Sequence, residues 1–103
     1  MIPLTISGRK WGSIEVLRLK AVTQFKRDLK KFEHDKKIQE KLEEIIDLLV
    51  NEKKLPEKNR DHDLVGNYVY HRECHITPDV LLIYRYDGEI VYLERIGSHS
   101  ELF

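Results

Sequence analysis

The sequence lacks the features that are typical of secreted and membrane proteins. Its 103 residues include one cysteine, Cys74, and three prolines. A single cysteine forms no internal disulfide, which excludes a disulfide scaffold and is typical of a reducing compartment. No apolar run approaches the roughly 18 to 20 residues that cross a bilayer, and the first residues lack the basic start and apolar stretch of a signal peptide. We therefore expect a cytoplasmic protein with no membrane contact.

The net charge is zero, but the two halves of the chain carry net charges of opposite sign. Residues 1–60 carry 15 of the 18 Lys and Arg against 10 acidic residues, and residues 61–103 carry 3 Arg against 8. Most of the positive excess lies between Arg18 and Lys37. A phosphate backbone could bind there, although a solvated helix face is the commoner meaning of such a run. The candidate RNA-binding residues in this strip are Lys26, Arg27, Lys30 and Lys31.

Apolar spacing predicts a strand followed by two helices. Residues 15–20 alternate in a way that favours a short strand. The apolar side chains then recur at helical spacing up to about His34 or Asp35, at Val22, Phe25, Leu29 and Phe32. A second helix is predicted over 37–51, with Asp35 as its cap and an apolar stripe of Ile38, Leu42, Ile45, Ile46 and Leu49. The two helices form an αα-hairpin.

Three runs rich in β-branched and aromatic residues follow a charged loop over 51–66 that ends in a turn at Gly66. The runs are 68–76, 80–86 and 90–95, and Asp87-Gly88 between the last two is a strong hairpin signal. The order predicts an α+β fold with the helices on one face of a mostly antiparallel sheet. We expect one domain over 13–103, preceded by a flexible N-terminal extension over 1–12.

Histidines gather in the C-terminal part of the chain, where four of the five lie: His62, His71, His75 and His99. Histidine titrates near neutrality, so two or more together can supply both a base and an acid. A metal site is disfavoured, because one cysteine cannot form the paired motifs of structural zinc sites. If 68–76 is extended, His71 and His75 lie about 13 Å apart on one sheet face while Cys74 faces the other. Cys74 itself is expected to be a small apolar filler.

Three segments resemble the YafQ branch of the RelE/ParE toxin superfamily. They are D-H-D-L-V-G at 61–66, R-E-C-H-I-T-P-D-V-L-L-I-Y at 72–84, and L-E-R-I-G-S-H-S-E-L-F at 93–103. That family shows a D-H-x-L-x-G loop, an H-x-x-P-D turn before L-I-Y, and an E-R-x-G-x-H-x-x-L-F terminus. The resemblance covers about Glu15 to Phe103. It implies the RelE-like microbial RNase fold: an N-terminal strand, a two-helix hairpin and a three-strand antiparallel meander.

The resemblance also implies a function. Its members are toxins of type II toxin-antitoxin systems that enter the ribosomal A site, contact 16S and 23S rRNA, and cleave the bound messenger without a metal or other cofactor. The neighbouring 2′-hydroxyl attacks the scissile phosphate. A DinJ-like or RelB-like antitoxin is the implied partner. The implied catalytic positions are His62, His75, Asp79, Arg95, His99 and Phe103.

These residue types suit the steps of such a cleavage. We assign His75 or Asp79 as the base or a base-orienting pair, Arg95 as the phosphate clamp and His99 as the general acid. His62 would position or neutralise the phosphate, and Phe103 would stack on a splayed base. Each has an ordinary structural alternative, such as a turn residue or a surface charge.

One position departs from the family. Val80 stands where relatives often carry Trp, so a stacking contact is either missing or supplied by Tyr84, and the codon preference is left open. The alternative functions are a ParE-like toxin, which blocks DNA gyrase without catalysis, and a small interaction module without toxicity.

Overall fold

The computed structural model describes residues 16–103. The predicted extension over 1–12 and the first residue of the predicted strand lie outside this range. The described elements, in chain order, are β1 (Arg18–Ala21), α1 (Thr23–Leu29), the 3-10 turn η2 (Lys30–Phe32), α2 (Lys36–Val50), η3 (Glu57–Asn59), β2 (His62–Asp63), η4 (Gly66–Tyr68), β3 (Arg72–Thr77), β4 (Val80–Asp87), β5 (Ile90–Gly97) and α3 (His99–Leu102). None of the helices in 16–103 combines the length and apolar content that crossing a bilayer requires.

The predicted helical hairpin is confirmed, with a tighter corner than expected. The Asp35 side chain accepts a hydrogen bond from the backbone N–H of Ile38 at 3.1 Å, so the predicted cap of α2 is present. The first helix leaves the α-helical path after Leu29 and ends in η2. The Gln39 side chain closes the corner, because its amide donates to the carbonyl oxygens of Phe32 and Glu33 at 2.9 and 2.8 Å.

The strands form one five-stranded sheet in the order β1-β5-β4-β3-β2. Strands β3, β4 and β5 form the predicted antiparallel meander, and Asp87 pairs with Ile90 across the predicted turn at Gly88. Two features were not predicted. The first strand pairs in parallel with β5, and the two-residue strand β2 extends the sheet beyond β3.

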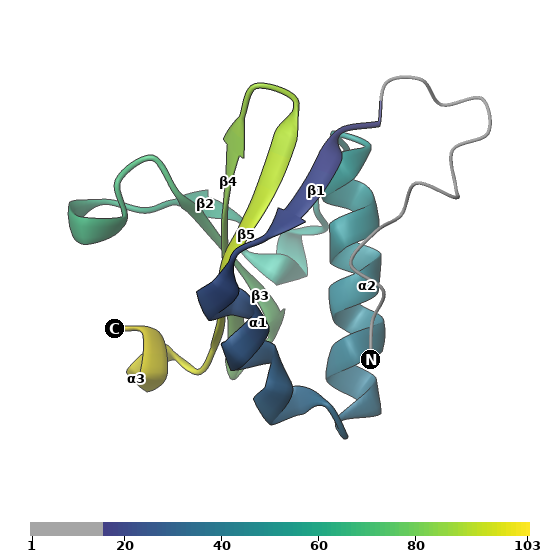
Figure 1. The fold of residues 1–103 in the computed structure, drawn as a ribbon, viewed down its shortest axis with the longest axis vertical. Coiled ribbons are helices and arrows are strands. Elements are labelled where there is room, and N and C mark those ends of the chain that lie inside the picture. The colour runs from purple at the N-terminus through teal and green to yellow at the C-terminus, as the bar shows by residue number, and fades with distance from the viewer. Residues whose placement is uncertain (1–15) are drawn as a thin grey trace.

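The sheet has two unlike faces, and α2 and α3 lie on opposite sides of it (Figure 1). The main core lies on the α2 face and includes Cys74, Leu82, Tyr84 and Leu93 together with the buried stripe of α2. The opposite face carries a small apolar cluster of Leu81, Ile83 and Leu102, with Leu64 and Tyr68 packed against it. The prediction of helices on one face holds for α1 and α2, while α3, which was not predicted, covers the other face.

The first of the three predicted runs, 68–76, is a strand only from Arg72 onward. Residues 66–71 form a loop, because the chain turns at Gly66 (φ 74°) and again at Tyr70 (φ 75°). The backbone N–H of Leu64 donates to the carbonyl of His71 at 2.9 Å and closes the loop. His71 therefore lies outside β3, and the expected spacing of His71 and His75 along one strand is wrong.

Candidate active site

A row of directly paired residues crosses four strands on the face that α3 covers. His62 pairs with Glu73, Glu73 with Ile83, and Ile83 with Arg95. Residues that pair directly in an antiparallel sheet point to the same face and lie about 4.5 to 5.5 Å apart at Cα. The same register places His75 opposite Leu81 on this face. The structure thus brings His62, His75 and Arg95 onto one surface.

Glu73 lies between the two histidines of this surface. Its Oε1 lies 3.3 Å from Nε2 of His62 and 3.9 Å from Nε2 of His75. The carboxylate is buried, with 5% of the residue exposed. Sequence analysis missed Glu73, although strand alternation alone places residues 73 and 75 on one face.

Both ring nitrogens of His62 face acceptors. Nδ1 lies 2.6 Å from the carbonyl oxygen of Arg60, which only accepts, and Nε2 faces Glu73. These two contacts fix the orientation of the His62 ring. The His75 ring contacts Glu73 through Nε2 only.

Arg72 fixes the loop that carries His62. Its guanidinium donates to both oxygens of Asp61 and to Asp63, the two neighbours of His62 in the chain. The hydroxyl of Tyr84 also donates to Asp61. Hydrogen bonding to Asp61 raises the pKa of Arg72, and burial together with the Asp61 carboxylate raises the pKa of Tyr84. Arg72 stays charged and Tyr84 neutral, so these contacts persist around neutral pH.

Asp28 of α1 holds Arg95 in place. Its carboxylate accepts from Nε of Arg95 at 2.7 Å, from the second guanidinium nitrogen at 3.3 Å, and from the backbone N–H of Ile96 at 3.1 Å. Burial opposes the ionisation of Asp28, but the hydrogen bonds from Arg95, Gln24 and Ile96 outweigh it and lower the pKa. The hydrogen bond to Asp28 raises the pKa of Arg95, and Tyr68 adds to the effect.

The helix α3 carries His99 and Phe103 to the same face. Ser98 and Glu101 form a reciprocal capping box that starts the helix directly after β5, and Leu102 packs into the small apolar cluster. The rings of His99 and Phe103 lie 5.0 Å apart, and Tyr68 contacts Phe103 edge-on at 5.6 Å. Phe103 is 55% exposed, so one side of its ring is open to solvent. Tyr68 was not singled out in the sequence, because only the fold brings η4 beside α3.

Asp79 and Val80 lie at the turn between β3 and β4. The Asp79 side chain is exposed and has no ion-pair or hydrogen-bond partner within residues 16–103. Glu73 is therefore the carboxylate that faces His75. Val80 packs against the core on the α2 face, and Tyr84 is 1% exposed in that core. Of the two alternatives left open for this position, the buried Tyr84 does not supply the stacking contact.

The four candidate RNA-binding residues lie along α1 and η2, beside the edge of β5 that Asp28 caps. All four are exposed. Lys31 forms an ion pair with Glu101 of α3 at 3.4 Å, which brings the end of this strip to the helix that carries His99. Their role in RNA binding stays a prediction.

Cys74 is fully buried on the opposite face from His75, as the alternation predicted. Burial raises the pKa of its thiol, so it is not a nucleophile at neutral pH. Across the described part of the chain, no three His, Cys, Asp or Glu side chains are grouped so that they could hold a metal ion.

Comparison with known proteins identifies the family of this chain. The sequence model described as "Bacterial toxin of type II toxin-antitoxin system, YafQ" matches residues 17–103. The chain belongs to the YafQ toxin family. The mRNA interferase toxin YafQ of Escherichia coli K12 is 35% identical over 81 residues, which cover 78% of this chain and 88% of that toxin.

Solved structures support the assignment. YafQ in the E. coli DinJ–YafQ complex is 32% identical with a TM-score of 0.76, and the match covers 84% of this chain and 98% of that one. A copper-bound mutant toxin from Helicobacter pylori is 38% identical with a TM-score of 0.80, covering 84% and 99%. The RelE-like fold of a YafQ toxin, expected from the sequence, is confirmed.

Proposed function

We propose that this protein is the toxin of a type II toxin-antitoxin system and an endoribonuclease that cleaves messenger RNA. One observation carries the proposal: the paired row His62, Glu73, Ile83 and Arg95 lies on the face against which α3 packs through Leu102. His99 of α3 contacts Phe103, and Phe103 contacts Tyr68 of the same face. A base, an acid and a fixed cation around one surface are what a metal-independent attack by a 2′-hydroxyl requires.

The first step is deprotonation of the 2′-hydroxyl. His75 is our candidate base, because its Nε2 faces Glu73 and its Nδ1 can take the proton. The O2′ atom then bonds to the neighbouring phosphorus. Glu73, rather than Asp79, is the positioning residue for His75.

The next steps are stabilisation of the phosphorane and release of the 5′-oxygen. Arg95 stays protonated and presents a rigid guanidinium to the phosphate oxygens, since Asp28 occupies only one side of it. His62, on the same face, is the candidate for positioning the phosphate. As the P–O5′ bond breaks, His99 donates a proton to O5′, leaving a 2′,3′-cyclic phosphate and a 5′-hydroxyl. Phe103 stacks on a base beside the cut.

The substrate and setting follow from the family. We propose that the messenger is cut in the ribosomal A site in the cytoplasm, with further contacts to 16S and 23S rRNA through Lys26, Arg27, Lys30 and Lys31. An E. coli relative is found in complex with DinJ. A DinJ-like or RelB-like antitoxin that covers the toxin is therefore the proposed partner.

The test compares two substitutions with a matched control. His99→Ala and Arg95→Ala should abolish growth inhibition and the cutting of ribosome-bound message, whereas His34→Ala should leave both unchanged. His34 is suitable because its side chain is 93% exposed in the corner between η2 and α2. Mapping messenger 5′ ends after induction reports the cutting, its codon and its reading phase.

Two results would count against the proposal. Wild-type cutting by either site variant would remove the role assigned to that residue. Growth inhibition without new messenger 5′ ends, together with loss of DNA supercoiling by gyrase, would instead support a ParE-like activity. Harmless overexpression would favour an interaction module.

A further inference from the structure

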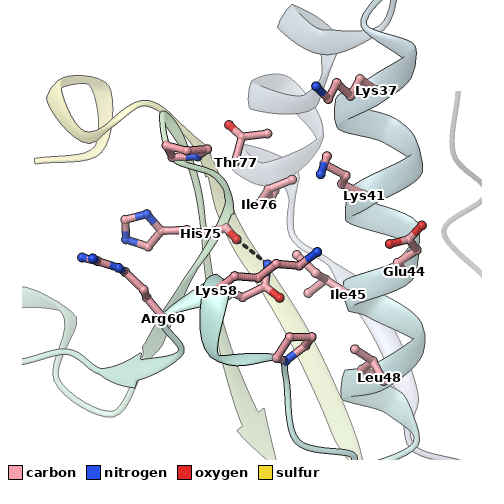
Figure 2. A pocket seen from close by; sticks show the side chains of 13 residues that line it. Lys37, Lys41, Glu44, Ile45, Leu48, Lys58, Arg60, His75, Ile76 and Thr77 are labelled. Carbon is pink, nitrogen blue, oxygen red and sulfur yellow. Dashed lines mark hydrogen bonds between the residues drawn. The ribbon is translucent and has the colours of Figure 1, made fainter.

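A hollow lies beside the candidate active site, on the α2 side of the sheet. It is a cavity of about 630 Å³ between α2, the turn η3 and β3. Figure 2 shows the side chains of α2 on one side of it and His75 and Arg60 on the other. Its apolar wall consists of Ile45, Leu48, Pro56, Ile76 and Pro78. A cavity of this volume is large enough for a ligand the size of a nucleotide.

The polar lining of the cavity is strongly cationic. Lys37, Lys41, Lys58 and Arg60 line it together with one carboxylate, Glu44. None of these four cations forms an ion pair with another residue in 16–103. By contrast, the arginines of the sheet, Arg72, Arg85 and Arg95, are all paired with carboxylates. Uncompensated cations around a hollow concentrate positive potential there and attract an anion.

The helical spacing of α2 places several residues of the cavity lining on one side of the helix. Lys37, Lys41 and Glu44 follow one another at steps of four and three along α2, so they share one side of the helix with Leu48. Figure 2 shows Lys37 and Lys41 on the side of α2 that faces β3. The cationic rim and the apolar wall therefore occupy a single face, which suits a ligand with one charged and one flat apolar part.

The cavity shares its boundary with the catalytic cluster. The side-chain amide of Asn59 donates to the carbonyl of His75 at 2.7 Å, and His75 itself lines the cavity. Arg60 lines it too, and its carbonyl contacts Nδ1 of His62. His75 and Arg60 thus line the cavity and also belong to, or contact, the catalytic cluster. They separate a ligand in the cavity from the proposed scissile phosphate.

We propose that this cavity binds a nucleotide of the messenger adjacent to the cleaved one, a conclusion that rests on the proposed ribonuclease function. The phosphate lies against Lys41, Lys58 and Arg60, and the base lies against Ile45, Leu48 and Ile76. A peptide would need a free strand edge or a long apolar helix groove. The cavity offers no continuous free strand edge, because β2 pairs with Arg72 and Glu73 of β3 and the side-chain amide of Asn59 donates to the carbonyl of His75. Its rim is cationic rather than a long apolar groove.

The test measures the affinity of the full chain for a short single-stranded RNA across a salt series. The variant is Lys41→Met/Lys58→Met, which removes two charges and keeps the apolar stems. The control, Lys53→Met/Lys54→Met, removes the same charge from exposed positions that neither line the cavity nor belong to the Arg18–Lys37 strip. Thermal unfolding verifies that both variants fold, and antitoxin binding is measured separately.

The expected result is a loss of RNA affinity of about tenfold in the cavity variant alone, with a salt slope shallower by about 1.4, as two lost phosphate contacts predict. Equal weakening of both variants, or unchanged RNA affinity, would overturn the proposal. Loss of antitoxin binding with RNA affinity intact would also overturn it and assign the cavity to a peptide.

The outcome is separable from that of the proposed function. A wild-type protein that cuts no message refutes the ribonuclease, whatever the RNA affinities are. If the wild-type protein cuts message and the cavity variant binds and cuts like the control, only the nucleotide site is refuted.

Discussion

The Nε atom of Arg95 on β5 lies 2.7 Å from Oδ2 of Asp28 on α1, and this carboxylate also accepts the backbone N–H of Ile96. The strand β1 pairs with β5 only as far as Leu93. Beyond that point the edge of β5 would be open, and Asp28 satisfies one of its donors. A single side chain therefore closes the sheet edge, anchors α1 and orients the proposed phosphate clamp.

Replacement of Asp28 by asparagine should lower both stability and cleavage. The amide cannot neutralise Arg95, and its NH2 group competes with the donors that the carboxylate accepts. We expect the free energy of unfolding to fall by about 2 kcal/mol, less than for a fully buried pair because Arg95 is 25% exposed. Urea unfolding of D28N, R95A and the double variant measures the coupling. Additive effects of the two substitutions would contradict the pairing.

The lowered pKa of Asp28 predicts that the free energy of unfolding falls in acid. The folded-state pKa of Asp28 is lower than the ordinary value of 3.8. The unfolded state therefore takes up a proton first, and the stabilisation is complete above pH 3.8 and lost as the pH falls through the folded pKa. The difference in unfolding free energy between wild type and D28N should be constant from pH 7 to about 5 and shrink toward pH 3. A difference that grows in acid would show that the sign is wrong.

The local pattern of the chain predicted most of the core. The stripe from Ile38 to Leu49 is buried as expected, and the turn at Gly88 closes the hairpin. These features depend on neighbours within a few residues, where helical spacing and turn chemistry decide the structure.

The features that were missed depend on contacts between distant segments. β2 has only two residues, and pairing with β3 defines it as a strand, so no periodicity reveals it. The parallel pairing of β1 with β5 and the ion pair of Asp28 with Arg95, 67 residues apart, have no local signal. Glu73 differs, because it lies two residues from His75 and alternation could have identified it.

Substitution of Glu73 by glutamine should impair cleavage without impairing binding. Gln keeps the shape but not the charge that faces His62 and His75. We expect the single-turnover cleavage rate on programmed ribosomes to fall about a hundredfold, as for loss of a general-base contribution. The affinity for ribosomes should stay within about twofold, because Glu73 is buried and adds no contact surface. A matched loss of affinity and rate would assign Glu73 a structural role only.

Arg72→Lys should loosen the loop of His62. Lysine keeps the charge but cannot hold Asp61 and Asp63 together through a planar fork. The variant should lose about 1 kcal/mol of stability and at least tenfold in cleavage, with faster amide exchange over 61–63. Arg85→Lys is the matched control, because Arg85 is equally exposed and pairs with Glu94 outside the site. Similar cleavage by both variants would argue against the positioning role.

Gly97→Ala should displace the helix that carries His99. A Cβ atom at this position would lie 3.0 Å from Oε1 of Glu101 and 3.3 Å from a methyl carbon of Leu102, both in α3. We expect a stability loss of about 1 kcal/mol and a larger loss of cleavage, because the capping box and the ring of His99 must shift together. Gly88→Ala is the control, because Gly88 has a φ of +62° in the hairpin at the far end of β5, where alanine is strained. This variant should lose a similar amount of stability and keep its cleavage activity. If Gly97→Ala loses cleavage, Gly88→Ala keeps it, and both lose similar unfolding free energy, the position of α3 determines activity. Similar cleavage by the two variants would contradict this.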